Sequence, residues 1–146
     1  MNSSVLEQDT FKRRKNMNNM TFHCKLILDN DQDCKCAVDC LTTHVMNHLY
    51  HDHNGDPLAD QNRVRVYVLA KFIRNYVEEL IDIENEYSYR NQMTDELICG
   101  AIQEIHFMEI AEDLIRDYSP KSPDEVAESE EFFNIMGFGN YDIDED

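Results

Sequence analysis

The sequence predicts an all-α protein built as one small domain of about four helices. Apolar residues recur at the three- and four-residue intervals of an α-helix through most of the chain. Capping residues, prolines and glycines stand at the ends of these periodic segments. The chain has 146 residues, of which 42% are hydrophobic, so a single domain can enclose a core.

The two ends of the chain differ from the middle in composition. Residues 1–19 are polar and carry the only basic run, so we expect a disordered basic arm there. The helical domain would then cover 20–137, and 138–146 would form an acidic tail. Residues 21–29 alternate apolar and polar side chains as a strand does, but their apolar residues could also share one helical face. Both interpretations stay open for this segment.

Two amphipathic helices are predicted in the first half. The first covers 33–51, with an apolar face that runs from Val38 to Leu49. The second covers 57–83, where Asp56 would cap the helix and Pro57 would be its first residue. Its outer face becomes acidic toward the C-terminal end, where carboxylates oppose the helix dipole.

The segment 94–118 is predicted to be a long central helix. Its apolar residues fall on two faces, so the helix should lie between two neighbours. Glu109, Asp113 and Asp117 follow one another four residues apart in the seam between these faces, about 6 Å apart at 1.5 Å rise per residue. On this helical wheel Glu112 projects into the main apolar arc and needs a partner there.

A short last helix is predicted over 122–136. Ser122 would be the N-cap, Pro123 the first helical residue and Glu125 the reciprocal residue of a capping box. Gly137 would end the helix.

Charge is distributed unevenly along the chain. The net charge is −17, from 30 acidic and 13 basic residues. Residues 1–77 contain 9 acids and 10 bases, whereas 78–146 contain 21 acids and 3 bases. An acidic surface of this kind repels nucleic acid, so we expect a basic protein partner instead of direct DNA or RNA binding. No apolar run is long enough for a membrane span or an export signal, which predicts a protein of the host cytoplasm with reduced cysteines.

A cluster of metal-ligand residue types occurs in the first predicted helix. Cys36, Cys40, His44 and His48 are spaced four apart, which places thiol and imidazole groups on one face, as zinc could use. A straight helix rarely offers more than two or three ligands to one ion, and buried cysteines beside a polar histidine edge explain the same pattern. We therefore expect no metal and no other cofactor. No phosphate loop or nucleophile motif occurs either, so we expect no enzymatic activity.

Rows of carboxylates form the strongest candidate site. Helical carboxylates one turn apart approximate the spacing of successive phosphates along a DNA strand, so they can present a DNA-binding protein with a duplex-like charge pattern. The predicted partner-binding residues are Glu78, Glu79, Asp82, Glu86, Glu109, Asp113, Asp117, Asp124, Glu125, Glu128, Glu130 and Glu131.

The central segment resembles the Ocr family of antirestriction proteins from T7-like phages. The resemblance rests on Gln103, Phe107, Ile110, the Asp113-Leu114-x-x-Asp117 pattern and the start at Asn19-Met20-Thr21-Phe22. It implies an all-helical, dimeric mimic of bent B-form DNA that occupies the DNA site of type I restriction-modification enzymes. It also implies that Asp113 and Asp117 are phosphate-mimic positions. The Cys/His-rich helix and the basic arm have no counterpart in the family, and a homodimer contact cannot be placed.

These observations together predict an acidic DNA mimic that blocks the DNA-binding site of a host defence enzyme, first of all a type I restriction-modification complex. An acidic mimic of another target, such as a CRISPR effector, a repair glycosylase or a nucleoid protein, is a second interpretation. A metal-binding adaptor built on the Cys/His helix is a third.

Overall fold

The computed structural model describes residues 17–85 and 92–141, and of 83–85 the backbone alone. The described residues are all-helical and contain no strand, which confirms the predicted fold class. Their six α-helices exceed the predicted number of about four. None of these helices combines the length and apolarity that a membrane crossing requires. The elements are α2 (Asn19–Asn30), α3 (Gln32–Met46), α4 (Gln61–Asn85), α5 (Gln92–Glu104), α6 (Phe107–Arg116), α7 (Pro123–Ile135) and the short 3-10 helix η1 (Phe138–Asn140).

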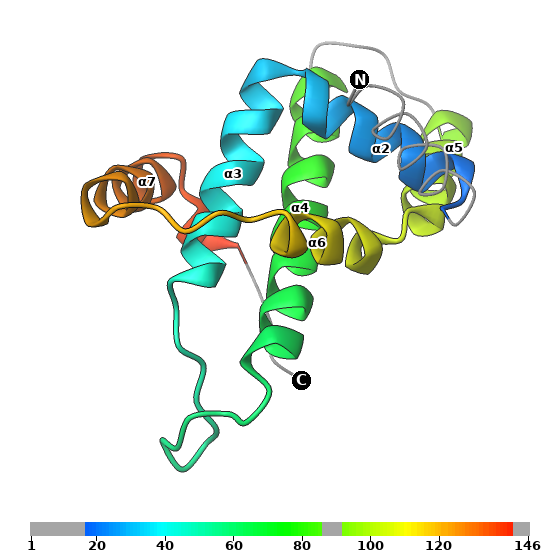
Figure 1. Cartoon of the computed structure of the whole chain (residues 1–146). Coiled ribbons are helices and arrows are strands. Elements are labelled where there is room, and N and C mark those ends of the chain that lie inside the picture. Colours follow the sequence, from blue (N-terminus) through cyan, green and yellow to red (C-terminus); the bar gives the residue numbers. More distant parts are fainter. Residues whose placement is uncertain (1–16, 86–91, 142–146) are drawn as a thin grey trace, which may run out of the picture.

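Helices α3 and α4 form the centre of the domain and run side by side in opposite directions (Figure 1). Helix α6 crosses α4, α7 lies against α3, and α2 lies beside α5. The side chains that meet at the centre come from α3, α4 and α6, as expected for amphipathic helices that bury one face each. Those with almost no exposed surface include Leu41, Val45, Leu69, Ile73 and Ile110.

The first predicted helix is present but shorter at its C-terminal end. The carboxylate of Asp31 caps it by accepting the backbone N–H of Cys34 at 3.0 Å. The helix ends at Met46, and the side-chain amide of Asn47 donates back to the carbonyl of Thr43 at 2.8 Å. Leu49 therefore lies outside the helix and is 49% exposed.

Helix α4 begins at Gln61 and not at Pro57 as predicted. The carboxylate of Asp60 accepts the backbone N–H of Arg63 at 3.1 Å, which is the capping bond that was expected of Asp56. Pro57 instead pairs with His51 in an isolated bridge of the loop between α3 and α4. The prediction failed because an Asp-Pro pair starts a turn as readily as a helix.

Residues 21–29 are helical, and the N-terminus of α2 breaks the predicted central helix in two. The hydroxyl of Thr21 is buried and accepts the backbone N–H of His106 at 2.8 Å. The side-chain amide of Asn18 donates to the carbonyl of Glu104 at 2.7 Å. These two bonds satisfy backbone groups that a continuous helix would have paired internally, so α5 ends and α6 starts in a new direction.

Because of the break, residues of α6 point in directions other than those of a continuous helix. The predicted environments of the neighbouring carboxylates Glu112 and Asp113 are therefore exchanged. Glu112, expected in the apolar arc, is exposed. Asp113, expected in a solvent-facing seam, is 6% exposed. Met108 is one of the apolar residues of 94–118 that the helical wheel places on the main apolar face, but it is 43% exposed.

The prediction for 122–136 is confirmed. The hydroxyl of Ser122 accepts the backbone N–H of Glu125 at 3.3 Å, Pro123 is the first helical residue, and α7 ends at Ile135. Gly137 has a φ of 75°, the left-handed conformation that glycine adopts without strain.

Residues 138–141, which the sequence assigned to the acidic tail, pack against the domain instead. Phe138 is 1% exposed and lies among the aromatic side chains of α4 and α7. The hydroxyl of Tyr141 donates to the carboxylate of Glu79 on α4 at 2.7 Å. The rest of the predicted tail, 142–146, and most of the predicted basic arm, 1–16, lie outside the described residues.

Candidate partner-binding surface

Helix α7 carries the most acidic surface in the described part of the chain. Its 13 residues include five acids and no base. Asp124, Glu128 and Glu131 lie at positions i, i+4 and i+7, which places them on one face, and all three are exposed. Glu125 is exposed as well, and it accepts a hydrogen bond from the hydroxyl of Ser122 at 3.1 Å. The face that α7 turns to solvent is therefore negative along its first two turns.

The opposite face of α7 is fixed to α3 by three side-chain contacts. The ring of His44 stacks on Phe133 with centroids 3.9 Å apart, and its Nδ1 lies 2.8 Å from Glu130 Oε1. The thiol of Cys40 donates to the carbonyl of Ser129 at 3.1 Å. Because Glu130 is held in this way, it belongs to the attachment of α7 and not to the exposed face.

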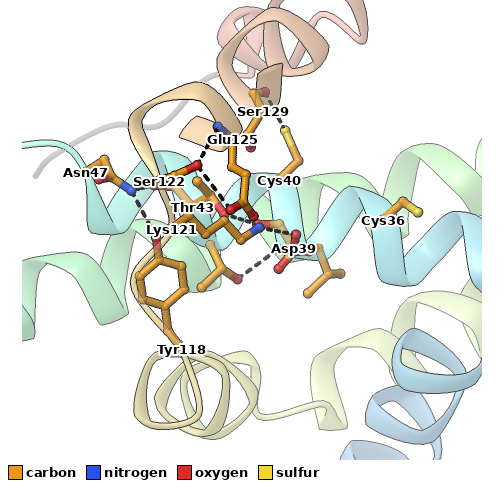
Figure 2. A network of polar contacts seen from close by, with 12 residues as sticks. Cys36, Asp39, Cys40, Thr43, Asn47, Tyr118, Lys121, Ser122, Glu125 and Ser129 are labelled. Atoms are coloured by element: carbon orange, nitrogen blue, oxygen red, sulfur yellow. Dashed lines mark hydrogen bonds and ion pairs between the residues drawn. The ribbon is translucent and has the colours of Figure 1, made fainter. Parts of the chain in front are cut away.

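Figure 2 shows how the segment before α7 is held on α3. Lys121 forms an ion pair with Asp39, and the side-chain amide of Asn47 donates to the hydroxyl of Tyr118 at 3.0 Å. Ser122 then caps the helix. These contacts fix where α7 starts and the direction in which it runs. The exposed carboxylates of α7 therefore have fixed positions relative to α3.

Apolar side chains continue the exposed face of α7 at its C-terminal end. Phe132 is 37% exposed, Ile135 is 74% exposed and Met136 is 48% exposed. Ile135 follows Glu131 by four residues and so extends the same face. The sequence-based prediction missed this apolar end, although extending the helical wheel through 136 would have found it. A partner that covers the whole face needs basic and apolar groups together.

The carboxylates predicted on α4 are partly used inside the domain. Glu78 pairs with Arg74 at 2.9 Å, and Glu79 accepts the hydroxyl of Tyr141. Asp82 is exposed, whereas Glu86 lies outside the described residues. The bond between Glu79 and Tyr141 connects this end of α4 to the segment that follows α7.

The predicted row on α6 does not form a uniform acidic surface. Glu109 lies 3.1 Å from Nδ1 of His106. Asp113 is buried and forms an ion pair with Arg116. Asp117 is exposed, and its carboxylate lies 3.8 Å from Nε of the same arginine. The side chain of Asp117 is 54% exposed and that of Glu109 is 38% exposed, whereas that of Asp113 is 9% exposed, so Asp113 is the member of the row that cannot act as a phosphate mimic.

Comparison of the chain with protein-family models, with curated proteins and with solved structures found no match. The resemblance to the Ocr family therefore depends only on the residues of the central segment and on the start at Asn19-Met20-Thr21-Phe22. Of the two phosphate-mimic positions that it implies, Asp117 lies at the surface and Asp113 does not.

The four metal-ligand candidates of α3 have separate environments. Cys36 is exposed and contacts the side chain of Gln32, whereas Cys40 is buried and bonded to α7. His44 is bonded to Glu130, and its ring lies 5.9 Å from that of His48. Within 17–85 and 92–141, no three His, Cys, Asp or Glu side chains come together as a metal site. The structure thus gives His44, but not His48, a packing role against α7.

The five cysteines divide into two classes of expected reactivity. Burial raises the pKa of Cys24 from 9.0 to about 11. Burial also raises the pKa of Cys34 and Cys40. Cys36 and Cys99 are exposed. Because the thiolate is the reactive form, we expect Ellman's reagent at pH 8 to titrate two thiols rapidly and the other three at least about tenfold more slowly.

The control for this labelling experiment uses single serine substitutions. Cys36→Ser and Cys99→Ser should each remove one rapid equivalent, and in denaturant all five thiols of the parent should react at similar rates. A third rapid thiol in the native protein would contradict the assignment of the buried cysteines.

Proposed function

We propose that the protein binds a basic surface of a DNA-binding protein and competes there with DNA. The observation that carries this proposal is the exposed face of α7, with Asp124, Glu128 and Glu131 in line and no base in the helix. Exposed carboxylates of α4, such as Asp82, add to the same negative field.

The spacing on α7 supports mimicry of a phosphate row. Asp124 and Glu128 are one helical turn apart, about 6 Å at 1.5 Å per residue, which is comparable with the separation of neighbouring phosphates along a strand. The attachment of α7 to α3 holds these groups in place before a partner arrives, so little side-chain and backbone freedom is lost on binding.

The apolar end of α7 favours a defined protein surface over a general attraction to cations. Ile135 and Met136 offer apolar area next to the carboxylates, and apolar contact adds shape-dependent affinity to the charge interaction. The Ocr resemblance makes a type I restriction-modification complex the first target to test.

Competition with DNA is the direct test. A purified type I restriction-modification methyltransferase is bound to a fluorescein-labelled duplex containing its recognition site, and the protein is titrated in while fluorescence anisotropy is followed. We expect displacement of the duplex, weakened by salt because the ion pairs are screened. The triple variant Asp124→Asn, Glu128→Gln, Glu131→Gln should lose about 2 kcal/mol of binding, about 30-fold, because each exposed pair contributes up to roughly 1 kcal/mol.

A matched control separates this face from the overall charge. The variant Asp33→Asn, Glu104→Gln, Glu112→Gln also removes three exposed carboxylates, but from α3, α5 and α6. It should weaken displacement by less than about threefold. Equal losses in the two triple variants would show that α7 is not the binding face, and a failure of the parent to displace the duplex would reject this target.

A further inference from the structure

A groove with a basic rim runs along α4, on a protein that is otherwise strongly acidic. Arg63, Tyr67, Lys71 and Arg74 follow one another at intervals of four, four and three residues, so they lie on one face of the helix. They line two adjoining pockets of about 450 and 580 Å³. Tyr67 and Met108 border both pockets, so the two adjoin along α4 and are called the groove below.

Two of the cations in this groove are not neutralised by the domain itself. Lys71 lies over the ring of Tyr67, with its Nζ 5.3 Å from the ring centroid. Across residues 17–85 and 92–141, no carboxylate forms an ion pair with Lys71 or Arg63, although the chain has 30 acidic residues. Arg74, in contrast, is paired with Glu78. Glu109 also lines the larger pocket, where it lies 3.1 Å from Nδ1 of His106. The cations of Arg63 and Lys71 therefore still leave the groove with a net positive charge.

The floor of the groove is apolar. Leu58 and Val64 line one end, and Ala70 and Ile105 line the other. Met108, which is 43% exposed, lies between them. A ligand that fits this surface needs negative groups for the rim and apolar groups for the floor.

The dimensions of the groove fit a short stretch of extended chain. From Arg63 to Arg74 the helix rises about 16 Å at 1.5 Å per residue. An extended peptide covers this distance with about five residues at roughly 3.3 Å each. A longer polyanion such as nucleic acid would extend beyond the rim into the acidic field of the chain, which repels it.

We propose that this groove binds an acidic peptide segment that carries apolar side chains. Its carboxylates contact Arg63 and Lys71, and its apolar side chains cover Met108. The site is independent of the acidic face of α7, because Phe72 and Tyr76 project from another face of α4 toward Phe133 and Phe138. The protein then has two binding surfaces of opposite charge.

The test uses the full chain and a fluorescein-labelled peptide that alternates Glu and Leu over six residues. We expect a saturable rise in anisotropy for this peptide and none for the version with Lys in place of Glu. Replacing Leu by Ser in the peptide should weaken binding at least about fivefold, since the contact with the floor is lost.

Variants of the groove are compared with a charge-matched control. Lys71→Glu should weaken peptide binding at least about tenfold, and Lys35→Glu, at an exposed position on α3, less than about threefold. If Lys71→Glu lowers the helical circular dichroism signal, Lys71→Gln and Arg63→Gln replace it, each with an expected loss of about threefold. Equal losses at positions 71 and 35, no saturable binding by the parent, or displacement of the peptide by a single-stranded hexanucleotide would overturn the proposal.

Discussion

Phe138→Ala is expected to lower the free energy of unfolding by about 3–5 kcal/mol, the range found for phenylalanine deletions in protein cores. Phe138 is 1% exposed, and its ring centroid lies 5.7 Å from that of Phe133 and 5.6 Å from that of Tyr141. Tyr76 meets it at a right angle from α4. Deleting the ring therefore leaves a cavity among four aromatic side chains, Tyr76, Phe132, Phe133 and Tyr141, and loosens α7 and Tyr141 together.

The measurement is urea unfolding followed by circular dichroism, with Phe132→Ala as the matched control. Phe132 is the same residue type in the same part of the chain, but it is 37% exposed. Its removal should cost less, about 1–2 kcal/mol, because part of its ring stays in water and the ring meets Phe138 only by its edge, with centroids 6.4 Å apart. Equal effects of the two substitutions would show that Phe138 is not buried in the core. Residue 138 would then belong to the acidic tail 138–146, as the sequence predicted.

The helices with local signals were predictable from the sequence. Helix α7 begins and ends where Ser122, Pro123 and Gly137 require, because an N-cap, a first-turn proline and a left-handed glycine act through their own backbone. The apolar face of α3 was also predictable, because the apolar residues that form it recur at helical intervals within one uninterrupted helix. The N-terminal limit of α4 was not, because Asp56-Pro57 and Asp60 both offer a start and only packing decides between them.

The break between α5 and α6 could not be predicted from the segment itself. Its cause is Thr21, which lies 85 residues away in sequence from His106 and accepts its backbone N–H. A helical wheel drawn through 94–118 assumes one continuous phase, so it misplaces residues after the break such as Met108, Glu112 and Asp113. That single error exchanged the roles of Glu112 and Asp113.

The prediction of an acidic partner-binding surface depended on composition, which fixes the total charge but not its arrangement. Several predicted carboxylates have partners within the domain, such as Glu130 with His44 and Glu78 with Arg74. The acidic face of α7 keeps its exposure because α7 attaches to α3 through its other side. The segment 63–74 was correctly placed in a helix, but only the carboxylates of that helix were considered as a binding surface, so the basic groove on α4 was missed.

The burial of Asp113 can be tested through its partner Arg116. Arg116→Ala is expected to lower the free energy of unfolding by about 2 kcal/mol. The side chain of Asp113 is 9% exposed and pairs with Arg116, which is 57% exposed. Its second oxygen, Oδ2, has no hydrogen-bond partner within the described residues. Removing the arginine leaves a buried carboxylate without a counter-charge. The cost falls below that of a fully buried pair, because water reaches the arginine side.

The double variant Asp113→Asn, Arg116→Ala should recover about 1 kcal/mol of this loss, because the amide carries no charge that burial would penalise. Glu112→Gln, at the exposed neighbour, should change the free energy of unfolding by less than about 0.5 kcal/mol. Urea unfolding of the three variants and the parent measures these differences. If Arg116→Ala matches the Glu112 control and Asp113→Asn brings no recovery, the carboxylate of Asp113 is solvated. It would then be available to a partner as the Ocr resemblance implies. If the double variant recovers stability as expected, Asp113 is part of the packing of α6. A loss of DNA competition in an Asp113→Asn variant would then result from lower protein stability and not from a missing phosphate mimic.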